Sequence, residues 1–315
     1  MRLLITGGAG FIGSNYIRHV LKRHQSAELV ILDKLTYAGN VDNLKGLLQD
    51  IEFIKGDICD ASVVSRVMNE CDCVLNFAAE THVDRSIFNS TAFVRTDVLG
   101  TQILLDAAKE HQIDRFVQVS TDEVYGSKQR GSFEEIDRLN PSSPYAASKA
   151  AADLLAHSYF VTYGFPCIIT RSANNYGPYQ HPEKLIPRFI TRAIRNKTLT
   201  VYGKGNNVRD WIHVEDNCRA LDCVRQMGKA GEIYNVGAGN EKSNLEVTKS
   251  ILKLLGKPLN LIRFTADRLG HDYRYSLDCS KIRSLGWQPG ISFEDGLLQT
   301  VRWYQDNESW WSALV

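Results

Sequence analysis

Two short motifs in this chain carry residue types that suit the transfer of protons and hydride. Tyr145 and Lys149 are four positions apart, so on a helix their side chains share one face. Because an ammonium group beside a phenol favours the phenolate, we expect Lys149 to lower the pKa of Tyr145 from its ordinary value of about 10. Tyr145 then suits a general base for a sugar hydroxyl, and Lys149 can also hold the ribose of a nicotinamide.

The second motif, Thr121-Asp122-Glu123, adds two carboxyl groups that a plain dehydrogenase does not need. Mutual repulsion and unequal burial push the pKa values of neighbouring carboxyls apart, so one can act as an acid while the other acts as a base. The pair therefore predicts a reaction in which oxidation is one step and water is eliminated. A solvated acidic turn or a helix N-cap pair is the alternative interpretation.

A glycine-rich turn follows the first predicted strand. Residues 2–6 run into Gly7-Gly8-Ala9-Gly10-Phe11-Ile12-Gly13, and a predicted helix follows. Gly7, Gly10 and Gly13 allow a tight turn and a close approach of the backbone to a pyrophosphate, whose charge then lies at the helix N-terminus. Because both the strand and the helix are in place, the turn predicts a dinucleotide site.

Carboxylates end the next two predicted strands. Asp33 can accept hydrogen bonds from an adenosine ribose and would repel a 2′-phosphate, which favours NAD over NADP, although Lys34 weakens that exclusion. Asp57, followed by Ile58, either meets the adenine amino group or caps the next helix. The sequence therefore predicts NAD as the cofactor and leaves two roles for Asp57.

The elements that must position these residues alternate short apolar runs with longer periodic segments, which is typical of βαβ units. The predicted strands are Arg2–Thr6, Glu28–Asp33, Glu52–Lys55, Cys73–Phe77, Phe116–Ser120 and Pro166–Arg171. The predicted helices are Phe11–His24, Val63–Glu70, Phe93–His111 and Pro144–Tyr163. We expect an α/β fold with a Rossmann-type doubly wound parallel sheet, which binds ligands at its carboxyl edge.

The pattern changes after about Ser172, where Asn, Gly and Pro gather in long loops. A smaller C-terminal α/β substrate-binding lobe is expected to begin there. Segments 210–225 and 234–239 again look like a helix and a strand of the first lobe. We therefore divide the chain into an NAD-binding domain, residues 1–174 with about 208–237, and a substrate-binding lobe, mainly 175–207 and 238–315.

Composition argues against several other classes of protein. The 315 residues include 37 basic and 36 acidic side chains, and a net charge of +1 predicts no general attraction to nucleic acid or to membranes. No apolar run approaches the roughly 18 residues that span a bilayer, and the first strand leaves no room for a signal peptide. The seven cysteines lack C-x-x-C spacing, so we expect small buried thiols, no metal site and a cytoplasmic location.

The ordered set of motifs resembles the extended short-chain dehydrogenase/reductase superfamily and, within it, the dTDP-glucose 4,6-dehydratase family. The residues that carry the resemblance to the superfamily are Thr6–Gly13, Asp33, Thr121, Tyr145 and Lys149. The match is narrowed by Asp122-Glu123 and by the segments 77–86, 120–126, 173–179, 182–187, 209–211 and 267–275. The resemblance runs almost from end to end, although the chain is shorter than many members between residues 124 and 140 and at its C-terminus.

The resemblance implies a nucleotide-sugar 4,6-dehydratase that converts dTDP-glucose to dTDP-4-keto-6-deoxyglucose with tightly bound, recycled NAD. Tyr145 is expected to take the proton of the C4 hydroxyl while hydride leaves C4, and Thr121 to orient that hydroxyl. The new ketone acidifies the C5 hydrogen, which Glu123 removes as a base, and protonated Asp122 donates to the departing C6 hydroxyl. Hydride then returns to C6, and C5 is reprotonated.

The resemblance also implies the residues that bind each ligand. Cofactor contacts are expected from Gly7, Gly10, Phe11, Ile12, Gly13, Asp33, Lys34, Thr36, Asp57, Ile58, Ala79, Thr96, Tyr145, Lys149 and Asn175. Substrate contacts are expected from Thr81, Thr121, Asn174, Lys184, Leu185, Tyr202, Arg209, Asn244, His271 and Arg274. Arg209 and Arg274 are expected to clamp the diphosphate, because their fork-shaped guanidinium groups suit phosphate oxygens.

Three alternative functions share part of this pattern. A UDP-sugar 4,6-dehydratase, acting on UDP-glucose or UDP-N-acetylglucosamine, would carry the same motifs. A UDP-sugar 4-epimerase would share the glycine turn and the Tyr145/Lys149 pair, but it has no need of Asp122 and Glu123. A non-catalytic NAD sensor would need neither pair.

The resemblance implies a homodimer as well. Apolar residues within 93–111 and 150–160 would form a two-fold helix bundle with a second subunit, although the sequence does not separate core from interface here. The tail residues Trp303, Tyr304, Trp310 and Trp311 either form an aromatic docking patch or belong to an amphipathic helix that packs on its own domain.

Overall fold

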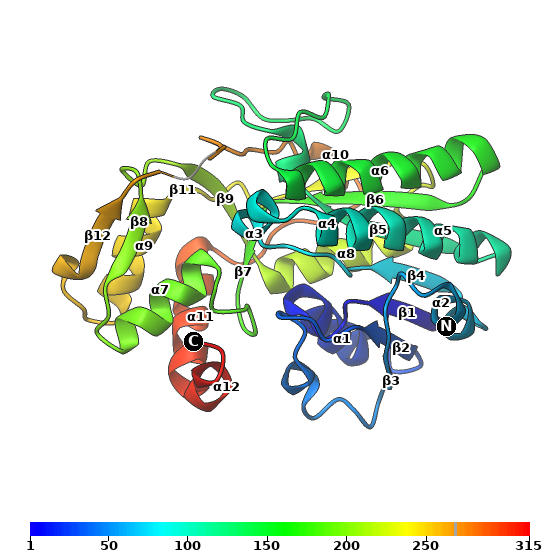
Figure 1. Cartoon of the computed structure of the whole chain (residues 1–315), viewed down its shortest axis with the longest axis horizontal. Coiled ribbons are helices and arrows are strands. Elements are labelled where there is room, and N and C mark those ends of the chain that lie inside the picture. Colours follow the sequence, from blue (N-terminus) through cyan, green and yellow to red (C-terminus); the bar gives the residue numbers. More distant parts are fainter. Residues whose placement is uncertain (268–269) are drawn as a thin grey trace.

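A seven-stranded parallel sheet forms the centre of the molecule in the computed structural model, which describes residues 1–267 and 270–315 (Figure 1). The strand order is β10-β6-β5-β4-β1-β2-β3, so the direction of winding reverses between β1 and β4. These strands are β1 (Arg2–Thr6), β2 (Glu28–Asp33), β3 (Glu52–Lys55), β4 (Cys73–Asn76), β5 (Arg115–Thr121), β6 (Cys167–Ser172) and β10 (Ile233–Val236). The predicted doubly wound Rossmann-type sheet is confirmed.

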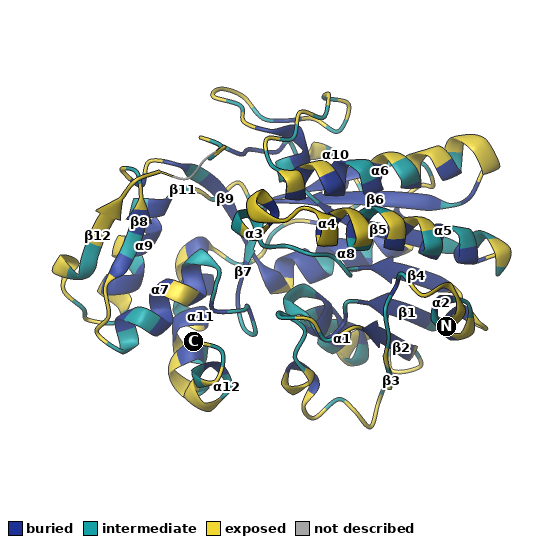
Figure 2. Cartoon of the chain, in the orientation of Figure 1, coloured by how far each residue is buried: buried dark blue, intermediate teal, exposed yellow. Residues whose placement is uncertain are grey.

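Helices cover both faces of this sheet (Figure 1). One face carries α2 (Ala61–Met68), α5 (Thr101–Glu110) and α6 (Pro144–Tyr163), which share a core with Leu4 of β1. The other face carries α1 (Phe11–Arg23) and α8 (Val214–Met227), which share a core with Leu3. Because successive strand residues point to opposite faces, strands covered on both sides need continuous apolar runs. Figure 2 shows these strands buried beneath helices whose outer turns are exposed.

A second, smaller group of elements lies beside the sheet and is built on two short sheets. Strands pair in the order β11-β9-β7 in one sheet, and β12 pairs with β8 in the other. Four helices pack here around a core that includes Tyr176, Phe189 and Trp211. The elements are β7 (Asn174–Tyr176), α7 (Leu185–Ile194), β8 (Leu199–Tyr202), β9 (Val208–His213), β11 (Glu241–Ser243), α9 (Asn244–Leu254), β12 (Ile262–Thr265), α11 (Phe293–Asp306) and α12 (Glu308–Ser312).

Two predicted helices differ from those in the structure. The segment predicted as one helix over 93–111 is α4 (Thr91–Phe93), the π-helical turn η2 (Val94–Gly100) and α5. An apolar period of 3.6 residues does not reveal the wider hydrogen bonding of a π turn, so the interruption was invisible in the sequence. The helix predicted from residue 210 begins at Val214, because residues 208–213 form β9 between β7 and β11.

The remaining elements are short helical turns in the connections. They are η1 (Val41–Leu44), α3 (Val83–Phe88), η3 (Asp122–Tyr125), η4 (Leu259–Leu261) and α10 (Ser280–Arg283). Within residues 1–267 and 270–315, none of the helices combines the length and the apolar character that crossing a membrane requires.

Local sequence determines how α6 presents its first turn to the carboxyl edge of the sheet. The Ser143 side chain caps the helix by accepting a hydrogen bond from the Ala146 N–H, and Pro144 occupies the first helical turn. Gly164, with φ of +66°, ends the helix. The N-terminal cap places Tyr145 and Lys149 near the end of β5, where both side chains are buried.

Candidate active site

The glycine turn between β1 and α1 has the geometry of a dinucleotide cradle. Gly7 has φ of +67°, and a Cβ atom there would lie 2.6 Å from the Ala78 backbone nitrogen. A Cβ atom on Gly13 would lie 2.5 Å from the Gly7 carbonyl oxygen. Both positions therefore need glycine. Helix α1 begins at Phe11 without a side-chain cap from Gly10, so the first N–H groups of the helix are suited to bind an anion.

Asp33 is fixed at the end of β2 by the backbone. Its Oδ2 accepts a hydrogen bond of 2.9 Å from the Ala9 N–H, and its Oδ1 accepts one of 2.7 Å from the Leu35 N–H. Burial raises the pKa of Asp33 despite these two bonds. The carboxyl group therefore lies in a set position between the glycine turn and the loop that follows β2.

Lys34 and Asp57 form an ion pair at the end of the neighbouring strands. Lys34 Nζ lies 2.7 Å from Asp57 Oδ2, and Asp57 Oδ1 accepts a hydrogen bond from the Cys59 N–H. The N-cap of α2 is Asp60, not Asp57, so the capping role considered for Asp57 is wrong. Asp57 lines the cavity instead, and its charge offsets that of Lys34 beside the site where a 2′-phosphate would bind.

The three residues after β5 are hydrogen-bonded to one another. Thr121 Oγ1 accepts a hydrogen bond of 3.3 Å from the Glu123 N–H and donates one of 3.3 Å to Asp122 Oδ1. The Asp122 side chain is only 2% exposed, and burial, with the negative charge of Glu123, raises its pKa well above the usual range. Burial and the charge of Glu123 therefore favour the protonated form of Asp122 beside a second carboxyl group.

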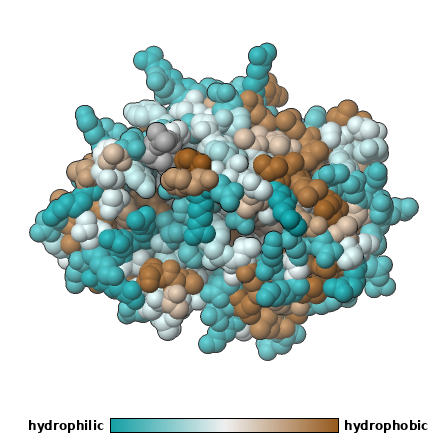
Figure 3. All heavy atoms as spheres, in the orientation of Figure 1, coloured by the Kyte–Doolittle hydropathy of each residue, from teal (hydrophilic) through white to brown (hydrophobic). Residues whose placement is uncertain are grey.

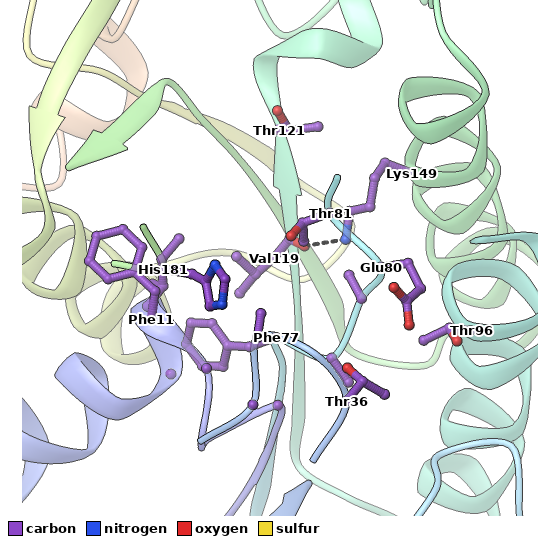
Figure 4. Close-up of a pocket in the computed structure, with 18 of the residues that line it drawn as sticks. Phe11, Thr36, Phe77, Glu80, Thr81, Thr96, Val119, Thr121, Lys149 and His181 are labelled. Atoms are coloured by element: carbon purple, nitrogen blue, oxygen red, sulfur yellow. Dashed lines mark hydrogen bonds between the residues drawn. The ribbon is translucent and has the colours of Figure 1, made fainter. Parts of the chain in front are cut away.

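Tyr145 and Lys149 lie together in the buried part of the site, but they are not coupled as predicted. Lys149 extends from α6 to β5, where its Nζ donates a hydrogen bond of 2.8 Å to the Val119 carbonyl oxygen (Figure 4). Burial raises the pKa of Tyr145 well above its usual value, and Glu123 and Asp97 act in the same direction. The net pKa of Tyr145 is therefore raised and not lowered as predicted, because Lys149 Nζ is bonded to the Val119 carbonyl and burial outweighs any effect of its charge.

Asp97 is a buried acid, next to Thr96 of the cavity lining, that sequence reasoning missed. It lies in η2, is 1% exposed, and accepts hydrogen bonds from Ser148 Oγ at 2.6 Å and from the Glu80 N–H at 2.9 Å. Burial raises its pKa to about 6, against the opposing charge of Lys149. The π turn, which often marks functional sites, points to Asp97 only once the structure is known, so the sequence carried no signal for it.

One cavity of about 290 Å³ collects every residue predicted to bind the cofactor. It also contains Thr81, Thr121, Asp122 and Glu123. Figure 4 shows Lys149 and Thr96 on one side of this cavity, and Phe11 and His181 on the other. The cavity lies at the carboxyl ends of the central strands, at the reversal between β1 and β4.

A second cavity of about 220 Å³ continues from the first into the smaller group of elements. Both cavities are lined by Glu123, Asn174, Glu183 and Lys184. The predicted substrate residues that line the second cavity are Asn174, Lys184, Leu185, Tyr202, Arg209, Asn244 and His271. Glu123 therefore lies where the two cavities meet, and Asp122 lines the first cavity beside it.

The two arginines predicted to clamp a diphosphate are placed differently. Arg209 lines the second cavity, with its guanidinium group 4.2 Å from the Tyr275 ring centroid and bonded to backbone carbonyls. Arg274 forms a two-bond ion pair with Glu241 and donates to the Gly131 carbonyl, and it is not among the described residues that line either cavity. Two residues of the predicted motif over 267–275, Arg268 and Leu269, lie outside the described residues.

Comparison with known proteins places the chain in a family. The family model described as GDP-mannose 4,6 dehydratase matches residues 4–300. The chain belongs to this family. It is 50% identical to a dTDP-glucose 4,6-dehydratase of Streptomyces niveus over 321 residues, which cover 100% of this chain and 96% of the relative. It is 54% identical to the low-salt glycan biosynthesis protein Agl12 of Haloferax volcanii, covering 96% of this chain and 98% of the relative.

A solved structure in the same family shares the whole fold. The dTDP-glucose 4,6-dehydratase DesIV from Streptomyces venezuelae, crystallised with NAD, has a TM-score of 0.98 and 51% sequence identity, and the match covers 100% of both chains. The resemblance to dTDP-glucose 4,6-dehydratases that the motifs predicted is therefore confirmed. The residues present here also fit NAD, because the glycine turn leaves room for a pyrophosphate and Asp33 is fixed beside it.

Sequence reasoning also missed four residues that line one or both cavities: His82, His181, Glu183 and Arg188. His82 Nε2 lies 3.5 Å, and His181 Nδ1 4.0 Å, from Glu183 Oε2. Burial lowers the pKa of both imidazoles. Arg188, an exposed cation on α7, lines the second cavity. Nothing in the sequence indicated this position, because only the packing of α7 brings Arg188 to the cavity. Among the described residues, no cluster of three or more His, Cys, Asp or Glu side chains is arranged to hold a metal.

Proposed function

We propose that this chain is a nucleotide-sugar 4,6-dehydratase that converts dTDP-glucose to dTDP-4-keto-6-deoxyglucose. The observation that carries the proposal is the buried Asp122, whose pKa is raised, next to Glu123, which lines both the cofactor cavity and the second cavity. A carboxylic acid kept neutral by burial can donate a proton to a leaving hydroxyl near neutral pH. The adjoining carboxyl group supplies the base that the same elimination needs.

The first step that the residues support is removal of the C4 hydroxyl proton by Tyr145. Thr121, at the end of β5, orients that hydroxyl, and Lys149 holds the nicotinamide ribose. The chemistry that NAD supplies when bound is reversible hydride exchange with C4 and C6, together with a positive charge in the cavity that Tyr145 lines. A positive charge favours the phenolate, and so opposes the rise in the pKa of Tyr145 that burial causes.

The elimination step assigns opposite roles to the two carboxyl groups. Once C4 is a ketone, the C5–H bond is acidified, and Glu123 takes the C5 proton. The C6–O bond then breaks, and Asp122 gives its proton to the departing hydroxyl, which leaves as water. Return of hydride to C6 and of a proton to C5 completes a reaction that is redox-neutral overall, so the cofactor is retained and recycled.

The relatives support the choice of nucleotide. The similar proteins from Streptomyces niveus and Streptomyces venezuelae are both named dTDP-glucose 4,6-dehydratase, and the latter was crystallised with NAD. We extend the thymidine nucleotide, the glucose and the cofactor to this chain on that likeness. The lining of the second cavity by Tyr202, Asn244 and His271 provides polar and aromatic groups for a nucleotide.

The test is to incubate the purified protein separately with dTDP-glucose, UDP-glucose and UDP-N-acetylglucosamine, and to follow the products by mass spectrometry. We expect loss of one water from dTDP-glucose without accumulation of NADH. Loss of water from a UDP-sugar alone would reassign the nucleotide. Unchanged mass with inversion at C4 would indicate an epimerase, and no turnover by NAD-loaded protein would indicate a sensor.

A homodimer and a cytoplasmic location are part of the proposal. Hydrophobic side chains gather over α5, α6 and the neighbouring η2 (Figure 3). The exposed apolar residues of η2 and α6 are Val94, Leu99, Leu154 and Val161. A two-fold contact through this face would bury them. The seven cysteines are all free, as is common in a reducing compartment.

Light scattering tests the dimer. Val161→Asp on α6 should convert a dimer to a monomer, whereas Met227→Asp, at an equally exposed position on the other face of the sheet, should not. A wild-type monomer, or a dimer insensitive to Val161→Asp, contradicts this interface.

We also propose which parts of the chain bind each ligand. Residues 1–174 with about 208–237 would bind NAD, and mainly 175–207 and 238–315 would bind the nucleotide sugar. Both α8 and β10 pack with the central sheet, in line with that division, whereas β9 pairs with β7 and β11. Substitutions at Tyr202 should therefore change the KM for the nucleotide sugar without changing NAD content.

A further inference from the structure

Ala9, at the centre of the glycine turn, has both of its backbone polar groups fixed. Its N–H donates to Asp33 Oδ2 at 2.9 Å. Its carbonyl oxygen accepts from the Asn40 N–H at 3.1 Å and from Asn43 Nδ2 at 2.8 Å. The turn flanked by Gly7 and Gly10 is therefore held from one side by β2 and from the other side by the segment that contains η1.

Asn43 connects this turn to the far end of the chain. The residue is 1% exposed, and its Oδ1 accepts a hydrogen bond of 2.9 Å from the indole Nε1 of Trp310 in α12, 267 positions later. Its carbonyl oxygen accepts a hydrogen bond of 2.6 Å from Arg18 Nη2 on α1. The amide of Asn43 thus lies between the turn and the C-terminal helix, with one end bonded to each.

The indole decides which end of the Asn43 amide faces the turn. An indole N–H can only donate, so it bonds to the oxygen of the amide and not to its nitrogen. With Oδ1 directed to Trp310, Nδ2 is directed to the Ala9 carbonyl. If the amide were reversed, two oxygen atoms would face each other at Ala9, and the buried carbonyl would lose a donor.

Aromatic contacts with the loop after β7 also keep Trp310 in place. The ring of Tyr179, in the loop after β7, lies 4.7 Å from the ring of Trp303 and 5.8 Å from that of Trp310, centroid to centroid. The guanidinium group of Arg18 lies 4.1 Å above the same Tyr179 ring. The C-terminal helices therefore pack on a loop that α1 also contacts, on the side of the smaller group nearest to α1 (Figure 1).

We propose that Trp310 is a positioning residue for the cofactor, which acts through Asn43 to hold the glycine turn in the shape that receives a dinucleotide pyrophosphate. The inference rests on the proposed binding of NAD, and it makes α12 a part of the cofactor site although α12 does not line the cavity. The aromatic tail singled out in the sequence is then neither a docking patch nor only a packing element.

The test removes the indole N–H and measures how firmly NAD is held. Trp310→Phe keeps a ring in contact with Tyr179 but cannot donate to Asn43. We expect bound NAD to exchange with isotopically labelled NAD⁺ about fivefold faster than in the wild-type holoenzyme, since one partly buried hydrogen bond is lost from the chain of contacts. We also expect the amides of residues 8–14 to exchange with deuterium faster in the variant.

Trp311→Phe is the matched control. Trp311 Nε1 donates to the Tyr304 carbonyl at 2.7 Å, so this variant also loses an indole hydrogen bond in α12, but one that stays within the C-terminal segment. It should lower the melting temperature while leaving NAD exchange within twofold of wild type. Equal effects of the two variants on NAD exchange, or no effect of Trp310→Phe, would overturn the proposal.

A double substitution tests whether Trp310 acts through Asn43. Asn43→Ala should accelerate NAD exchange at least as much as Trp310→Phe, and Trp310→Phe should add nothing in that background. Multiplying effects would show that Trp310 acts by another route and would also overturn the proposal. Every readout uses NAD alone, so failure of the dehydration assay would leave this test intact, and failure here would leave the dehydratase assignment intact.

Discussion

The predicted ligand-binding residues are distributed differently between the two cavities of this protein. Every residue predicted to bind the cofactor lines one cavity, whereas Arg274 lies away from both cavities and Arg188 takes a position that was not foreseen. The cofactor cavity is built from βα turns at one edge of one sheet, where strand ends place residues automatically. The nucleotide cavity depends on how loops and α7 pack against that edge, which local sequence does not encode.

The prediction with the largest expected effect concerns Glu123, which lines both cavities. Glu123→Gln should lower kcat by ~10²–10⁴-fold, because a positioned general base contributes on that order. The NAD content per chain should stay at the wild-type level, since the amide keeps the shape of the side chain. The measurement is wash-out of deuterium from C5-deuterated dTDP-glucose; wash-out at the wild-type rate would show that another group is the base.

Asp97 gives a second test, because its burial depends on the packing of η2 against α6, which local sequence does not reveal. Its pKa is raised by burial from 3.8 to about 6, so its contribution to stability is full below about pH 4 and is lost as pH rises through 6. The free energy of unfolding of wild type minus that of Asp97→Asn should therefore fall by about 2 to 3 kcal/mol between pH 4 and pH 7. Urea unfolding at four pH values measures it, and a constant difference would refute the assignment.

Substitutions of Arg188, which lines the second cavity, and of Arg274, which does not, test that cavity directly. Arg188→Ala should raise the KM for dTDP-glucose about tenfold with little change in kcat, as expected for loss of one charged contact to a phosphate. Arg274→Ala leaves Glu241 without its guanidinium partner, so it should lower the melting temperature and change KM less than threefold. Steady-state kinetics on both variants decides between them, and the reverse order of KM effects would support the predicted role of Arg274 in clamping the diphosphate.

The smallest expected effect concerns the choice between NAD and NADP. Asp57→Asn removes the partner of Lys34, which should raise affinity for NADP relative to NAD by about fivefold. Adding Lys34→Ala should return the ratio to the wild-type value, because the unpaired ammonium is then gone. Titration of both cofactors measures the ratio, and an unchanged ratio in Asp57→Asn would mean that the ion pair plays no part in selection.

Features set by local interactions were predicted from the sequence, and features set by contacts between distant residues were not. The first three strands were predicted to the residue, and so was α6, because apolar runs, a Ser cap and a closing glycine are local signals. The segment 93–111 was predicted as one helix because a π turn leaves no mark on the apolar period. The pKa of Tyr145 was predicted in the wrong direction because spacing places Lys149 on the same helical face but does not say where Nζ points.

The sequence by itself determined the chemistry that is available: a glycine turn that only glycines can form, a carboxylate after β2, and the two reactive motifs at Thr121–Glu123 and Tyr145/Lys149. Those features depend on residue type and on spacing within one element. Only the tertiary structure decided that the pKa of Asp122 is raised, that Lys149 bonds to Val119, and that Trp310 reaches Asn43. Burial and partners brought from distant positions set these properties, and neither exists until the chain is folded.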